Sequence, residues 1–246
     1  MNPSDPLTVF RANVDSVSKL INFDKEVQDL AISGVEELHQ FLKDKKGYDN
    51  PKWNGENTLL MLRGIRQSPV LRDRYSQIFN QAVVLLVSYF GSTLGDIFRS
   101  SSATALREDD QKILRTELKV SVDDVLQLSE NPEQKIGDFL ISHEKLSFQD
   151  MGSTHRAFRE YFGVNIEVDE RVHNIIAGQA CRHAIVHDAA RCNSRTMNQL
   201  RSATPRSLKP DLEVGQTITF TIAEVEALSA DMTGYVEALA GTLHGD

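Results

Sequence analysis

VLRDRYSQIFNQAVVLLVSYFGSTLGDIF, residues 70–98, is the stretch that decides the fold. Its apolar residues recur at helical spacing, but they lie nearly all the way round the helix instead of on one face. They are Ile78, Phe79, Ala82, Val83, Leu85, Leu86, Tyr89, Phe90, Leu94, Ile97 and Phe98. A helix that is apolar on all sides is one that other elements cover on all sides. We therefore expect this segment to be the central helix of a bundle, with its end at Ser100–Ser102.

Helical patterns occupy most of the chain on both sides of this segment. Residues 7–44 have apolar groups at helical spacing without an internal proline, which predicts one long or two consecutive amphipathic helices. Further helices are expected at 58–65, 109–119, 122–128, 132–143, from a cap at Ser153 to about 162, from a cap at Asp169 to 187, and at 223–243. Only NIEV at 165–168 and TITFTI at 217–222 are strand-like. The expected fold class is mainly α.

The proline and glycine positions divide the chain in two. Ser68-Pro69 ends the short helix at 58–65 and precedes the central segment. We therefore predict an N-terminal helical arm over residues 1–69 and a helical bundle over residues 70–246.

Composition narrows the class of protein. The chain has 246 residues, 40% of them apolar and 25% charged, which is typical of a globular protein and not of a disordered tail. Its net charge of −8 argues against a protein that binds nucleic acid by bulk positive charge, but it allows a locally basic site. Two cysteines are too few for a disulfide framework. The start of the chain lacks the pattern of a secretory signal, and the longest strongly apolar run, Ala82–Tyr89, is short for a membrane span, so we expect a cytoplasmic protein without a membrane segment.

The helix expected at 170–187 has polar groups in an apolar setting. Small residues along it predict that another helix approaches closely. At its C-terminal end stand Arg182, His183 and His187, which would be costly to bury without a partner or a role. His183 and His187 are four residues apart and so share one helical face, whereas Arg182 is about 140° away from His187 around the helix.

These residue types fit the cleavage of RNA without a metal. That reaction needs a base for the 2′-hydroxyl proton, an acid for the leaving 5′-oxygen, and positive charge at the phosphate. An imidazole titrates near neutral pH and can act as base or acid. A guanidinium stays charged and binds phosphate oxygens through two parallel hydrogen bonds.

The sequence RHAIVHD at 182–188, preceded by SFQDMGSTHRAFREYFGVNIEV at 147–168, resembles HEPN domains, and most closely their RiboL-PSP-HEPN branch. The resemblance spans roughly residues 70–240. It implies a helical bundle with a motif of Arg, four to six residues, then His, often with a polar residue directly after the Arg. Arg182, His183 and His187 match these three positions, whereas the acidic residue often found in the first bundle helix has only Asp96 as a possible counterpart.

The resemblance also implies a function. Many HEPN proteins are endoribonucleases of toxin, antiphage or RNA-processing systems that need neither metal nor cofactor. Two protomers commonly bring their motifs together in one site, so we expect a homodimer, RNA as substrate, and an antitoxin or defence-system protein as a possible partner. In this reading Arg182 holds the scissile phosphate, His187 is general base or acid, and His183 positions the phosphate or assists proton transfer.

A basic segment follows the motif. Residues 191–210 contain five cations and no acidic residue on a chain of net charge −8: Arg191, Arg195, Arg201, Arg206 and Lys209. We expect them to contact the RNA backbone beside the scissile phosphate, without reading bases. The alternative is a solvated loop whose cations pair with acidic groups of the same chain.

Other interpretations of the motif stay open. The two histidines could be ordinary interior residues with Arg182 in a structural ion pair, as in a non-catalytic HEPN module that binds RNA or protein and dimerises. His at i and i+4 is also good geometry for zinc, with a third ligand from Cys181, Cys192, Asp188 or His173. Against zinc, Ala184 stands where the metalloprotease pattern has glutamate.

Overall fold

The structure, a computed structural model, describes residues 5–45, 55–67, 76–107, 121, 125 and 131–244. Its helices are α1 (Pro6–Asp44), α2 (Gly55–Gln67), α4 (Ser76–Arg107), α7 (Pro132–His143), α8 (Met151–Phe162), α9 (Glu170–His187), α10 (Ser194–Ser202) and α11 (Ile222–His244). No strand occurs in these ranges, where the only β pairing is an isolated bridge between Arg191 and Thr217. The prediction of a mainly α protein is confirmed, whereas TITFTI is not a strand.

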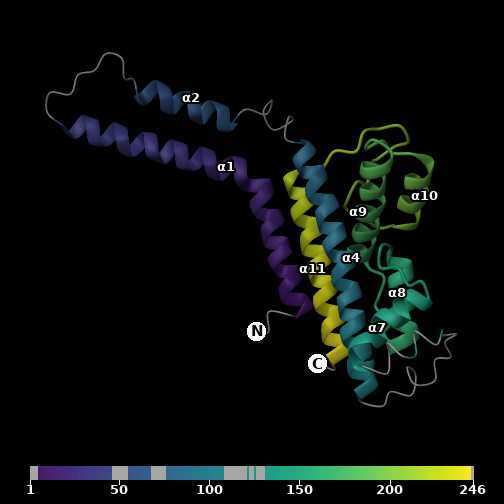
Figure 1. Cartoon of the computed structure of the whole chain (residues 1–246). Helices are drawn as coiled ribbons and strands as arrows, with labels where there is room; N and C mark the ends of the chain where they lie inside the picture. The colour runs from purple at the N-terminus through teal and green to yellow at the C-terminus, as the bar shows by residue number, and fades with distance from the viewer. Residues whose placement is uncertain are drawn as a thin grey trace.

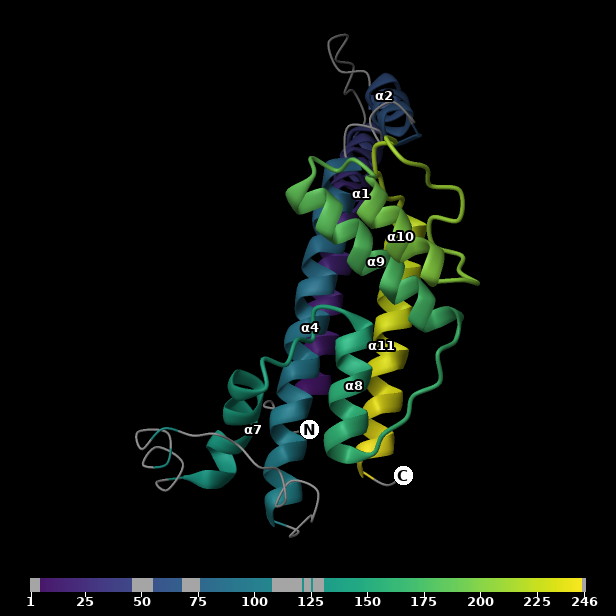
Figure 2. The ribbon, with the colours of Figure 1, turned by 90° about the vertical axis from the view of Figure 1, so that its right-hand side faces the viewer.

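The central position of α4 follows from its sequence. It packs against α1, α7, α9 and α11 (Figures 1 and 2), and most of its apolar side chains from Ala82 to Phe98 are buried, the others half-buried. The prediction that it ends at Ser100–Ser102 is wrong, because the helix continues to Arg107. The Ser102 hydroxyl is buried and donates to the Phe98 carbonyl oxygen at 2.8 Å, so the helix itself satisfies this polar group.

One segment of α4 passes a test for membrane helices. By length and composition alone, Gln77–Arg107 is long and apolar enough to cross a bilayer. More than half of its most apolar stretch is buried inside the protein, and the core helix of a soluble protein passes the same test. The single run Ala82–Tyr89 therefore understates how apolar this helix is.

α1 is one continuous helix with two environments. Asp5 caps it, accepting from the Thr8 backbone N–H at 3.0 Å. Its first half lies in the bundle, where the Phe10 ring packs 6.1 Å from that of Phe90. Beyond Ile21 the helix continues away from the bundle beside α2 (Figure 1). The projecting arm is thus the second half of α1 with α2, and the predicted division at residue 69 places core residues such as Phe10 in the arm.

The helices after α4 largely follow the predicted pattern. α7, α9 and α11 begin and end within about a residue of their predicted bounds. The N-cap of α8 is Asp150 rather than Ser153: the Asp150 carboxylate accepts from the Ser153 backbone N–H at 2.8 Å. A cap accepts from a residue two or three positions into the helix, and Asp150 is the side chain so placed. The helices predicted at 109–119 and 122–128 lie outside the described residues, except for residue 125.

A glycine in α7 permits close packing against α4. A Cβ added at Gly137 would lie 2.6 Å from the Arg99 Cα, which is backbone and cannot move aside. In contrast, nothing lies within 4 Å of a Cβ added at Gly64 of α2.

We predict opposite effects of alanine at these two glycines. Gly137→Ala should lower the free energy of unfolding by about 1–3 kcal/mol, because the helices must separate. Gly64→Ala should not lower it and can raise it by up to about 1 kcal/mol, since alanine favours the helix. Urea unfolding followed by circular dichroism measures both. Equal stability of Gly137→Ala and the parent protein would contradict the packing of α7 on α4.

Candidate functional site

α9 carries the motif and is held by its small residues. Asp169 caps it by accepting from the Val172 backbone N–H at 3.0 Å. Ala177, Ala180 and Ala184 are buried, and a Cβ added at Gly178 would lie 2.8 Å from the Leu228 side chain of α11. The predicted close approach of another helix is confirmed, but the helix belongs to the same chain. This face of α9 is therefore covered and is not free to meet a second protomer.

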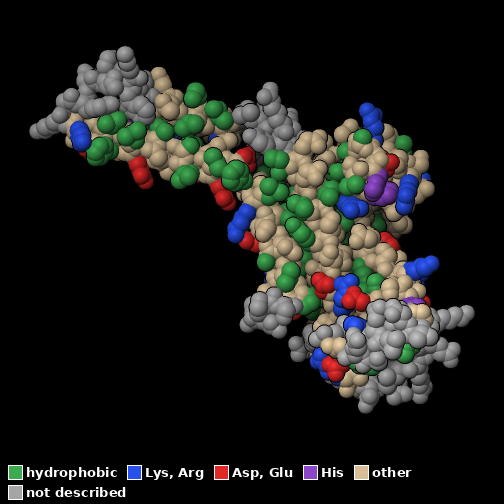
Figure 3. All heavy atoms as spheres, in the orientation of Figure 1, with side chains coloured by type: hydrophobic (Ala, Val, Ile, Leu, Met, Phe, Trp, Pro, Cys, Tyr) green, Lys and Arg blue, Asp and Glu red, His purple; other side chains and the backbone are tan. Residues whose placement is uncertain are grey.

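The motif residues lie together at the C-terminal end of α9. The His183 and His187 rings are in contact, with centroids 4.7 Å apart and an interplanar angle of 46°. His187 is exposed, whereas Arg182 and His183 are half-buried. Figure 3 shows histidine side chains at the surface here with Lys or Arg side chains beside them.

Arg182 is a guanidinium without a partner in the described part of the chain. It has no hydrogen bond or ion pair with another described residue, and its Nε is buried without a hydrogen-bond partner. A half-buried cation in this state is costly unless it binds an anion. The structural ion pair considered for Arg182 is thus not formed with any described residue.

The environment of His183 favours its neutral ring. Burial lowers the pKa of this imidazole, and the positive charges of Arg195 and His187 lower it further, against an opposing effect of Asp188 and with a still smaller lowering by Arg182. The ordinary pKa of a histidine is 6.5, and the His183 ring therefore stays neutral down to a lower pH than a free histidine does. A neutral imidazole at neutral pH can accept a proton.

Contacts after His187 fix the end of the helix. The backbone turns through left-handed conformations at Ala189 and Ala190, with φ of 51° and 58°. The Ala190 carbonyl oxygen then accepts from the Ile218 N–H at 2.7 Å. Asn80 of α4 clamps the returning segment, donating to the Ile218 carbonyl oxygen at 2.9 Å and accepting from the Phe220 N–H at 3.1 Å. The loop that follows the motif is thus hydrogen-bonded to a returning segment, which is itself hydrogen-bonded to the central helix.

No carboxylate orients the histidines in the described part of the chain. The Asp188 carboxylate accepts from Asn193 Nδ2 at 2.9 Å and so serves the turn. Asp96 pairs with Arg99 at 2.9 Å and lies 16 residues beyond Asn80 on α4, about 24 Å along the helix axis. The structure therefore does not bring Asp96 to the motif.

The basic segment is partly helical and its five cations fall into two groups. α10 lies within it, capped by Asn193. Arg191, Arg195 and Arg201 are exposed, and their side chains make no hydrogen bond or ion pair with described residues.

The other two cations hold the chain together. Arg206 donates to the carbonyl oxygens of Leu200 at 2.6 Å and Ala203 at 3.0 Å, and more weakly to that of Lys209 at 3.2 Å. Lys209 pairs with Glu224 at 2.7 Å and lies 4.5 Å from the centre of the Phe220 ring. The alternative, cations that pair with acidic groups of the chain, describes Lys209, whereas Arg206 is bound by backbone carbonyl oxygens, so both are engaged within the chain.

Two polar residues of α9 that sequence reasoning did not select for this role anchor the same segment. A ring nitrogen of His173, Nδ1, is 2.9 Å from the Pro205 carbonyl oxygen. The buried Asn174 accepts from the N–H groups of Ser207 at 3.0 Å and Leu208 at 2.9 Å, and donates to Asp231 at 2.9 Å. The available signal was an asparagine inside an apolar helix, which is buried only with its hydrogen bonds satisfied.

The side chains considered as zinc ligands are not gathered. Burial raises the pKa of the Cys181 thiol to about 12, which disfavours the thiolate that binds zinc. Cys192 is also buried. No group of three or more His, Cys, Asp or Glu side chains among the described residues is arranged to hold a metal ion.

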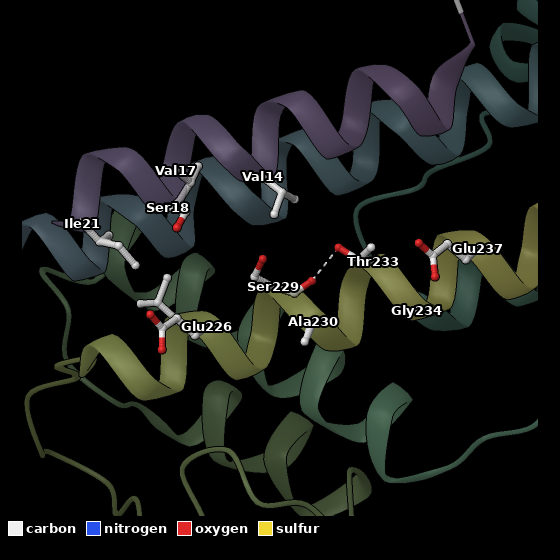
Figure 4. A pocket seen from close by; sticks show the side chains of 11 residues that line it. Val14, Val17, Ser18, Ile21, Glu226, Ser229, Ala230, Thr233, Gly234 and Glu237 are labelled. Atoms are coloured by element: carbon white, nitrogen blue, oxygen red, sulfur yellow. Dashed lines mark hydrogen bonds between the residues drawn. The ribbon is translucent and has the colours of Figure 1, made fainter. Parts of the chain in front are cut away.

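A cavity elsewhere in the bundle does not involve the motif. It lies between α1 and α11, has a volume of about 450 Å³, and is lined by Val14, Val17, Ile21, Ala230 and their neighbours (Figure 4). None of Arg182, His183 and His187 lines it. The motif therefore lies outside this cavity, at the surface end of α9.

Comparisons with known proteins leave the family open. No protein-family model, curated protein or solved structure matches this chain. The resemblance to HEPN domains remains a prediction.

We predict that the pKa of His183 responds to Arg195. Arg195→Gln removes a positive charge that disfavours the imidazolium, so the pKa of His183 should rise. Titration of the histidine ring protons by nuclear magnetic resonance measures it. Arg201→Gln is the matched control and should leave the titration unchanged, since Arg201 does not influence His183. A His183 pKa that is the same in Arg195→Gln and the parent protein would contradict this geometry.

Proposed function

We propose that this protein is a metal-independent endoribonuclease of the HEPN type that acts at Arg182, His183 and His187. One observation supports it most: a half-buried guanidinium without a partner lies at the same helix end as two imidazoles in contact. Positive charge for a phosphate and two groups that can exchange protons are what cleavage of RNA by its own 2′-hydroxyl requires.

The proposed roles follow from the environment of each residue. Arg182 holds the phosphate and neutralises the charge that grows on its oxygens. His183, neutral at pH 7, accepts the proton of the attacking 2′-hydroxyl. His187 in its protonated form gives a proton to the 5′-oxygen as its bond to phosphorus breaks. The products are a 2′,3′-cyclic phosphate and a 5′-hydroxyl, so protons and bonds balance without a cofactor.

The proposed RNA surface consists of Arg191, Arg195 and Arg201. All three are exposed and follow the motif directly in the chain, and Arg195 is near enough to His183 to lower its pKa. Cations in this position contact phosphates on either side of the scissile bond and give affinity without base specificity.

The proposed setting is cytoplasmic, in toxin–antitoxin, antiphage or RNA-processing systems, with an antitoxin or defence-system protein as the restraining partner. A second candidate is a non-catalytic HEPN module that binds RNA or protein. It is favoured by one observation, that neither Asp188 nor Asp96 orients the histidines. A site without an orienting carboxylate binds phosphate as well as a complete one but transfers protons less efficiently.

The decisive test is cleavage of a mixed RNA pool in EDTA. We expect the parent protein to cut it, and Arg182→Ala and His187→Ala each to lose at least about 100-fold in rate, since each removes a proton-transfer or charge-stabilising group. The ends of the products should carry a 2′,3′-cyclic phosphate and a 5′-hydroxyl, which identifies the reaction.

The matched control is Arg156→Ala, which removes an exposed arginine of α8 away from the motif and should keep the parent rate. Circular dichroism shows that each variant is folded. RNA binding without cleavage by the parent protein would favour the non-catalytic module.

A further prediction concerns salt. Three phosphate contacts release about 0.7 counterions each, so the logarithm of RNA affinity should fall with the logarithm of salt concentration with a slope near −2. Reversing the charge of Arg191, Arg195 and Arg201 together should weaken binding and flatten this slope. Reversing Arg206 should instead reduce stability, because it breaks the carbonyl contacts of the segment. A slope unchanged in the triple variant would remove these arginines from the RNA surface.

A further inference from the structure

The arm half of α1 has an exposed apolar face, which we name the outer stripe. It consists of Phe23, Val27, Leu30, Leu38 and Phe41, whose exposed fractions are 64%, 47%, 75%, 44% and 56%. Successive residues of the stripe are three, four or eight positions apart, so all five lie within about 80° of one another around the helix. Figure 3 shows hydrophobic side chains along this arm.

The outer stripe stays exposed in the described part of the chain, where Lys45 Nζ lies 4.4 Å from the centre of the Phe41 ring and α4 borders the start of the stripe. The opposite face of the same helix carries Ile32, which is buried, and α2 packs beside the arm with its buried Leu59. Gly34 lies in the middle of the stripe, and a Cβ added there would meet nothing within 4 Å. A glycine inside a helix costs about 1 kcal/mol relative to alanine, and no contact with a described residue explains Gly34.

We propose that the outer stripe pairs with the outer stripe of a second copy of this chain, antiparallel and with Gly34 at the twofold axis. The proposal does not depend on ribonuclease activity. It also differs from a dimer built on the small-residue face of α9, which is covered within the chain.

The spacing of Val27, Leu30, Leu38 and Phe41 is symmetric about Gly34, whereas the position opposite Phe23 is Lys45. A twofold axis at this residue places Leu30 of one copy opposite Leu38 of the other, and Val27 opposite Phe41. A self-complementary pattern is what an isologous interface requires. Gly34 then meets Gly34 at the axis, where the lack of side chains lets the two helix backbones approach closely.

A cavity at the start of the stripe accepts a large side chain. It has a volume of about 310 Å³ and is lined by Leu20, Phe23 and Val27 of α1 and by Ile78 and Phe79 of α4. In the proposed register Phe41 of the second copy lies over Val27, beside this cavity. An aromatic ring that enters an apolar cavity is a strong anchor of an interface.

The area is sufficient for a stable dimer. The stripe and the adjoining Leu20 leave roughly 600 Å² of apolar surface exposed on each copy. With the polar side chains that border the stripe, the total comes near the ~800 Å² that each partner buries in a standard interface. An uncovered apolar patch of this size is uncommon on a monomer.

Cysteine cross-linking tests both the pairing and its register. Gly34→Cys should form a disulfide-linked dimer under mild oxidation at micromolar concentration, because the two thiols meet at the axis. Gln40→Cys is the matched control: it is also exposed on α1 but points away from the stripe, so it should stay largely unlinked. Both natural cysteines are buried and do not compete.

Two further variants determine the direction. Leu30→Cys and Leu38→Cys should link poorly alone and at least several-fold better when mixed. Efficient linking of Leu30→Cys alone would show parallel pairing and overturn the register. If Gly34→Cys forms no more linked dimer than Gln40→Cys does, the proposal is overturned. The stripe would then be covered by a membrane or by another protein. Each outcome is read from the mass of the linked species and so is independent of RNA cleavage.

Discussion

The burial of α4 on all sides is the constraint on which the rest of the structure depends. Its apolar surface has no polar face to turn toward water, so α1, α7, α9 and α11 must surround it. The contacts differ in kind: the Phe10 and Phe90 rings meet where α1 crosses, and a glycine allows α7 to approach the backbone. Once these helices are placed, little freedom remains for the segments that join them.

The candidate site is a consequence of this arrangement. The buried face of α9 is made of small residues that fit against its neighbours, so its polar end emerges at the edge of the bundle. Asn80 of the central helix then bonds the segment that returns beside the motif, through Ile218 and Phe220. The backbone beside the motif is thus held by hydrogen bonds that begin in the core.

The arm is the one described part that does not follow this logic. Inside the bundle, most large apolar side chains among the described residues are buried against neighbouring helices of the same chain. Along the second half of α1 the inner face has one, namely α2, while the outer stripe has none. An exposed apolar surface with a solvent-exposed glycine at its centre is typical of a place where another molecule packs. The apolar pattern of the bundle is thus accounted for by contacts among the described residues, whereas that of the outer stripe is the basis of the proposed pairing.

Helical periodicity by itself determined the class of the fold, the identity of the central helix and the ends of α7, α9 and α11, because spacing and capping are local properties of the chain. It also placed Arg182, His183 and His187 at one helix end. Local pattern failed at Ser102, where a side-chain bond to the preceding turn lets the helix continue, and at Ser153, since Asp150 is the cap.

Only the tertiary structure decided which cations are free. Arg191, Arg195 and Arg201 face solvent. Arg206, in contrast, is bound to backbone carbonyl oxygens and Lys209 to Glu224, although nothing in the sequence distinguishes these two cations from the other three. It likewise separated Asp96 from the motif and divided α1 between core and arm. The reason is physical: a periodic pattern shows that a face is apolar or a residue is charged, but its partner lies far along the chain and is chosen by packing.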